Sequence, residues 1–87
     1  MDIYAKLKNR KTGKKYGVVV EVKDRKKAVS STEAQKLLEA AKAVKAKYGL
    51  EGMMVLYLSE NAPFSKPAGE MLKKARAMYG TSKNVLG

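Results

Sequence analysis

The stretch Gly17-Val18-Val19-Val20-Glu21-Val22-Lys23 decides the fold of this chain, because it reads as a β-strand that carries a charged pair. Residues two apart on a strand belong to the same face of a sheet. Glu21 and Lys23 are therefore expected side by side on one face, and the even-numbered valines on the other. The pattern predicts a strand with one apolar face and one face that carries a carboxylate and an ammonium group.

A second strand pattern precedes this stretch, and a polar, glycine-containing turn separates the two. Residues 2–9 and 15–23 are therefore expected to form an antiparallel hairpin. The apolar residues of the first strand have odd numbers, and the valines of the second have even numbers. In an antiparallel pair these two sets lie on the same face only if the numbers of two paired residues add up to an odd value. A turn in the middle of the polar segment gives a sum of about 25, which is odd. Asp2 is then expected on the same face as Glu21 and Lys23, away from the core.

Two later segments have the apolar spacing of amphipathic helices, residues 32–48 and 66–79. Gly49 and Gly80 stand just past their expected ends, and Ser65 precedes the second as an N-cap. The first helix has two candidate capping boxes, Ser30 with Glu33 or Thr32 with Gln35.

Residues 53–58, between the two helices, are apolar without alternation, as expected for a strand buried on both faces. The right-handed rule for crossovers makes this strand parallel to residues 15–23. The resulting order is ββαβα, an α/β fold in which a small, three-stranded mixed sheet packs with two helices. One domain is expected over residues 1–80, with 81–87 as a C-terminal tail. Because so small a fold leaves one sheet face thinly covered, we expect either a homodimer or a further N-terminal element.

The composition excludes several kinds of site. The 87 residues include no cysteine and no histidine, which excludes disulfides, thiolate zinc sites and histidine-based catalytic triads. The longest apolar run is far too short to span a membrane, and the N-terminus lacks the apolar segment of a signal peptide. A cytoplasmic protein without a membrane partner is expected.

The formal net charge is +11, and residues 6–27 hold ten of the nineteen Lys and Arg residues but only two acids. Such a chain favours contacts with the phosphates of nucleic acid. The alternatives are that the charge serves solubility or reflects a thermophile composition. The candidate nucleic-acid-binding residues form two clusters: Arg10, Lys11, Lys14 and Lys15, and Arg25, Lys26 and Lys27.

Asp2, Glu21 and Lys23 make chemical sense as a set. Two carboxylates supply the hard oxygen ligands that Mg²⁺ (or Mn²⁺) takes, and the backbone carbonyl of Val22 would be a further ligand. The metal would polarise a phosphoryl oxygen and lower the pKa of a bound water. The lysine would orient that water or stabilise the charge that develops on the phosphate. The ordinary alternative is a solvated strand face with a weak ion pair.

Further motifs extend this set over nearly the whole chain. Asp2-Ile3, the Glu21-Val22-Lys23 strand, Ser30-x-x-Glu33-x-Gln35 and Pro63-Phe64-Ser65-x-x-Ala68 occur in this order, with the apolar strand before the last of them. Together they resemble the PD-(D/E)xK nuclease superfamily, and look closest to Mrr-type restriction endonucleases and archaeal Holliday-junction resolvases. The resemblance implies a restriction-endonuclease-like core that lacks the N-terminal helix of that family.

The resemblance also implies residue roles and a reaction. Asp2 and Glu21 would be metal ligands, Lys23 the catalytic lysine, and Gln35 an active-site residue near the metal or the scissile phosphate. The implied activity is that of a metal-dependent deoxyribonuclease, which hydrolyses a DNA phosphodiester with Mg²⁺ and often acts as a dimer. The residues leave two other functions open: a non-catalytic basic nucleic-acid-binding module, and a structural α/β miniprotein whose charge serves solubility.

Overall fold

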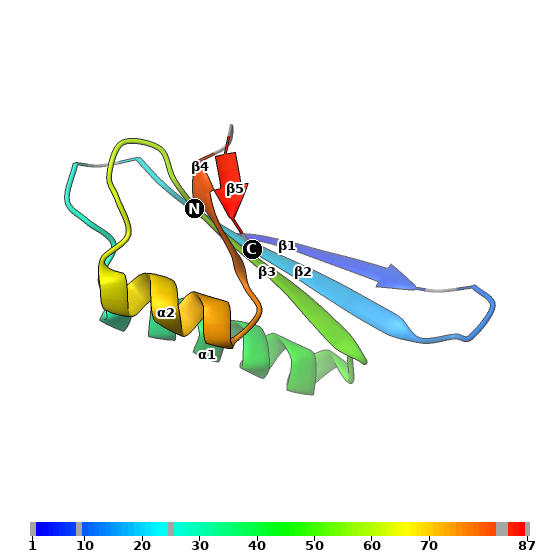
Figure 1. Ribbon diagram of the computed structural model, residues 1–87. Coiled ribbons are helices and arrows are strands. Elements are labelled where there is room, and N and C mark those ends of the chain that lie inside the picture. The colour runs from blue at the N-terminus through cyan, green and yellow to red at the C-terminus, as the bar shows by residue number, and fades with distance from the viewer. Residues whose placement is uncertain (1, 9, 25, 82–83, 87) are drawn as a thin grey trace.

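The computed structural model describes the backbone of residues 2–8, 10–24, 26–81 and 84–86, and the side chains of residues 10–24 and 26–81. Within this part of the chain, one five-stranded sheet is covered on a single face by two helices (Figure 1). The protein is thus a small α/β domain. Neither helix of the described chain has the length and apolar character needed to cross a membrane.

The strands follow one another across the sheet in chain order. They are β1 (Asp2–Lys8), β2 (Lys15–Lys23), β3 (Gly52–Ser59), β4 (Met78–Thr81) and β5 (Asn84–Leu86). The β1–β2 and β4–β5 pairs are antiparallel, and β2–β3 and β3–β4 are parallel. The expected hairpin and parallel third strand are therefore present, but the sheet has two strands more than the three expected.

The first helix, α1 (Ser31–Tyr48), begins one residue before its expected start. The hydroxyl oxygen of Ser30 accepts a hydrogen bond from the backbone N–H of Glu33 at 3.3 Å, and Gly49 ends the helix in the left-handed conformation at φ 61°. Ser30 with Glu33 is therefore the capping box, and Thr32 lies inside the first turn. The cap and the terminal glycine fix α1 at both ends.

The second helix, α2 (Lys66–Lys74), is shorter than expected. Arg76 takes a positive φ of 57°, and the next N–H, that of Ala77, donates to the carbonyl of Leu72 at 2.9 Å. This turn ends the helix, so residues 78–81 form β4 and residues 84–86, expected in a C-terminal tail, form β5. The expectation failed because the apolar spacing of α2 runs on into β4, and a four-residue strand is too short to show alternation.

Both helices lie on the same face because the strand order from β2 to β4 runs in one direction. A right-handed crossover from β2 to β3 and another from β3 to β4 then place α1 and α2 on one side of the sheet. The core lies between this helix layer and the sheet. It consists of Val19, Val29, Ala34, Leu37, Ala41, Val55, Tyr57, Ala68, Leu72, Ala77 and Tyr79.

The expected parity of the hairpin is confirmed, but the expected core face is wrong. Asp2 pairs with Glu21 and Ile3 with Val20, so the paired numbers sum to 23 (2 + 21), which is odd. The covered face, however, is that of Val19 and Glu21, while the even-numbered valines are only half-buried. For the same reason β3 is not buried on both faces, and Met54 is 52% exposed.

Candidate active site

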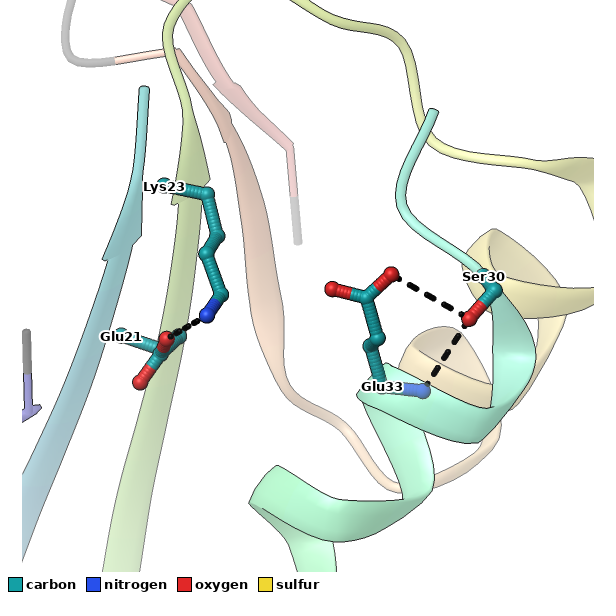
Figure 2. Close-up of polar contacts among 4 residues, drawn as sticks. All are labelled: Glu21, Lys23, Ser30 and Glu33. Carbon is teal, nitrogen blue, oxygen red and sulfur yellow. Dashed lines mark hydrogen bonds and ion pairs between the residues drawn. The ribbon is translucent and has the colours of Figure 1, made fainter. Parts of the chain in front are cut away.

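Glu21 lies on the helix-covered face of β2 and is only 8% exposed. Its Oε1 atom is 3.0 Å from Nζ of Lys23, whose side chain is 34% exposed (Figure 2). Glutamate is almost never buried without a partner, and the lysine supplies that partner here. A solvated strand face therefore does not describe Glu21, although Lys23 retains access to water.

The register of the sheet places two residues directly beside Glu21. Asp2 of β1 and Tyr57 of β3 are its direct partners on the two neighbouring strands. Direct partners across a ladder belong to the same face of the sheet. The backbone therefore places Asp2 where the sequence predicts it, beside Glu21; the Asp2 side chain lies outside the described residues.

Glu33 is a residue of this region that the sequence reasoning assigned to helix capping alone. It lies in the first turn of α1 and is half-buried, and its carboxylate accepts a hydrogen bond from the hydroxyl of Ser30 at 3.3 Å. In Figure 2 the contacts drawn for Glu33 are those with Ser30, and none joins it to the Glu21–Lys23 pair. The only available signal was its position three residues after Ser30, which the capping box already explains.

Gln35 and Val22 are less clearly part of the site. Gln35 is exposed, and its side-chain N–H donates to Glu39 Oε1 at 3.1 Å, one turn further along α1. Val22 lies between the charged pair on β2, at the register position of Leu58. The roles expected for the Gln35 side chain and the Val22 carbonyl stay predictions.

The described side chains do not form a closed cage for a metal ion. Among the described side chains, no group of three or more metal-ligating residues lies close enough together to hold an ion. Mg²⁺ usually binds through one or two carboxylates, with waters and substrate phosphate in its other positions. Glu21 supplies one carboxylate for such a site, and the backbone of Asp2 holds the facing register position; the Mg²⁺ expected from the sequence stays a prediction.

The basic clusters lie at opposite ends of β2. Lys14 and Lys15 are exposed at the hairpin turn with their neighbours Arg10 and Lys11. Lys26 and Lys27 are exposed beyond the other end, and Arg25 lies outside the described residues. The strand between them is nine residues long, which separates its ends by about 26 Å. The sequence clusters are thus two surfaces, and the Glu21–Lys23 pair is beside the second.

The motif Pro63-Phe64-Ser65-x-x-Ala68, which contributed to the family resemblance, has a structural role. Phe64 makes edge-on contacts with the rings of Tyr57 and Tyr79, at centroid distances of 5.4 and 5.1 Å. The hydroxyl of Ser65 caps α2 by accepting from the backbone N–H of Ala68, which is fully buried. Packing and capping are therefore sufficient to explain this motif.

Comparison of the chain with protein-family models, curated proteins and solved structures found no match. The functional inference therefore depends on the residues of this site. Of those predicted from the sequence, the structure joins Glu21 to Lys23, places the Asp2 backbone opposite Glu21, and leaves Gln35 on the helix surface.

Proposed function

We propose that this protein is a Mg²⁺-dependent DNA endonuclease, a resolvase-like phosphodiesterase of the PD-(D/E)xK type. The observation that carries the proposal is the burial of Glu21, paired with Lys23, in a sheet where Asp2 is its direct partner. A hairpin, a helix, a parallel strand and a second helix follow in the order on which the resemblance rests, which supports the proposal.

Different residues of the chain would bind the metal and stabilise the reacting phosphate during hydrolysis. Glu21 and Asp2 would hold the metal, and Mg²⁺ when bound would polarise the phosphoryl group and help a water to ionise. Lys23 reaches Glu21 from a side chain that is one-third exposed, so it can also donate to a phosphate arriving from solvent. Glu21, at 3.0 Å from the Lys23 ammonium, would also orient Lys23.

The basic clusters would hold the DNA backbone. The cluster at Lys26 and Lys27 follows Lys23 closely in the chain, and the cluster at the hairpin turn is about 26 Å away. That separation is less than one turn of duplex DNA, about 34 Å, so one duplex can contact both. The contacts would be to phosphates and therefore independent of base sequence.

A plasmid-nicking assay in Mg²⁺ or Mn²⁺ tests the proposal. Glu21→Gln and Lys23→Met should each lower the cleavage rate by about a hundredfold or more, since each removes a group that acts on the reacting phosphate. Lys42→Met, which removes an exposed lysine of α1, is the matched control and should cleave at the wild-type rate. Cleavage that survives both site substitutions would exclude the proposal, as would inactivity of the wild type on linear, branched and supercoiled DNA.

The second candidate is a non-catalytic basic module that binds nucleic acid. It is favoured by the exposure of Lys and Arg side chains at both ends of β2, because these side chains can bind phosphates whether or not the protein cleaves DNA. This function predicts tight DNA binding that weakens steeply with salt, no cleavage with either metal, and no effect of Glu21→Gln on affinity.

A further inference from the structure

The face of the sheet opposite the helices has no layer over it among the described residues (Figure 1). We call it the open face. Its described positions on β2 and β3 are Tyr16, Val18, Val20, Val22, Gly52, Met54, Leu56 and Leu58. None of these residues is charged or fully buried, and six of the eight have aliphatic or methionine side chains. The open face is therefore an uninterrupted apolar surface rather than the polar side of a half-buried sheet.

The register makes this surface continuous across the sheet. Val20 pairs with Leu56, and Leu56 pairs in turn with Met78 of β4. On the other side Val20 pairs with Ile3, so the same row reaches the backbone of β1. Met54, which is 52% exposed, lies two residue pairs along the ladder from this row, on the same face and beside Val18. The apolar positions thus extend across four neighbouring strands.

The size of the open face suits a protein interface. Five strands at about 4.8 Å spacing make the sheet about 24 Å wide, and β2 is about 26 Å long. Because β4 and β5 are shorter than β2, the area of the open face is about 500 Å². The largest apolar patch of a typical monomer is about 300–600 Å² and is often functional. Two such faces together would bury about 1,000 Å², which is the lower bound for a specific interface.

We propose that the open face packs against the open face of a second copy of this chain. A two-fold interface places the same surface on both sides, so an apolar face needs no complementary charge on its partner. Aligned sheets pack about 10 Å apart with their side chains interdigitated, and Met54 is the most exposed side chain available for that packing. The proposal does not depend on the nuclease function, because Glu21 and Lys23 lie on the other face.

The charge of the chain predicts how this dimer responds to salt. Each copy carries +11, and the described part of the open face contains no charged residue. The two copies therefore repel each other from their remaining surfaces, and added salt screens that repulsion. Dimerisation should strengthen as salt is raised, whereas an assembly bridged by an acidic partner or by nucleic acid should weaken.

Sedimentation velocity of the nucleic-acid-free protein, over a hundredfold range of concentration at low and high salt, tests the proposal. The wild type should move from monomer to dimer with a dissociation constant in the micromolar range, about 1–100 µM, that falls at high salt. Met54→Lys places a charge on the most exposed position of the face and should raise that constant at least tenfold. Ala43→Lys adds the same charge at an exposed position of α1 and is the matched control.

The results show whether a second copy of the chain or a different partner covers the open face. A wild type that stays monomeric throughout would overturn the proposal and leave the face to a different partner. A dimer that is equally stable in Met54→Lys and Ala43→Lys, or that dissociates with salt, would also overturn it. Circular dichroism of both variants shows whether they remain folded, and Val18→Thr, a smaller polar change beside Met54, replaces Met54→Lys if that variant unfolds.

Discussion

Removal of Lys23 should destabilise the protein more than removal of the charge on Glu21, although the two residues form one ion pair. The reason is the difference in burial: the Glu21 side chain is 11% exposed and that of Lys23 is 34% exposed. Lys23→Met leaves a buried carboxylate without a cation. Glu21→Gln leaves a lysine that can turn toward water.

The magnitudes follow from that difference. Loss of one partner from a fully buried pair costs about 3–5 kcal/mol. Because water reaches the Lys23 side of the pair, we expect Lys23→Met to cost about 2–3 kcal/mol. Glu21→Gln keeps the shape and one acceptor, and it removes a desolvated charge, so its cost should stay within about 1 kcal/mol. The double variant should recover much of the loss, since it leaves no buried charge.

Urea unfolding followed by circular dichroism measures these differences, with all variants at one protein concentration so that self-association does not shift the midpoints. Lys42→Met, an exposed change of the same type on α1, should be nearly neutral. Equal losses for Glu21→Gln and Lys23→Met would refute the reasoning, because they would mean that the pair is equally accessible to water at both ends.

Three further changes test other parts of the structure. Arg76→Gly should raise the free energy of unfolding by about 0.5–1 kcal/mol in urea, because residue 76 has a φ of 57°, which glycine adopts without strain. Arg76→Ala keeps a Cβ and is the control; if it stabilised the fold as much as Arg76→Gly, the reasoning would be contradicted. Phe64→Ala should lower stability by about 3 kcal/mol through its lost contacts with Tyr57 and Tyr79, and a loss below about 1 kcal/mol would mean that the cluster collapses into the gap. Lys14→Ala should reduce the salt slope of DNA binding, measured by fluorescence anisotropy, by about 0.9 if it contacts one phosphate; an unchanged slope would place DNA elsewhere.

Local signals in the sequence were sufficient for several elements. The Ser30 cap and Gly49 bound α1 within one residue, because capping and the left-handed conformation depend on neighbouring residues alone. The parity of the hairpin also followed from the apolar pattern, and the register that pairs Asp2 with Glu21 confirms it. The actual register differs from the expected one by a shift that leaves every residue on the same face.

The choice of the covered face could not be read from the sequence. Counting apolar residues on β2 favours the face of the three even-numbered valines, whereas the helices cover the face that carries Val19 and the charged Glu21. That choice depends on the handedness of two crossovers and on the order of β3 and β4, which are non-local. The end of α2 was missed for a related reason, since nothing about Arg76 marks it as a left-handed residue.

Several residues that carry the family resemblance have a structural role that is sufficient to explain them. Ser30 and Ser65 cap helices, and Phe64 packs between two tyrosines, so any sequence with this fold benefits from them. Glu21 and Lys23 differ, because a charge on the covered face costs desolvation energy that an apolar residue would not. The fold gains nothing evident from this pair, and a cost retained without a structural return supports the proposal that the pair belongs to a functional site. The stability of Glu21→Gln therefore bears on function as directly as its activity does.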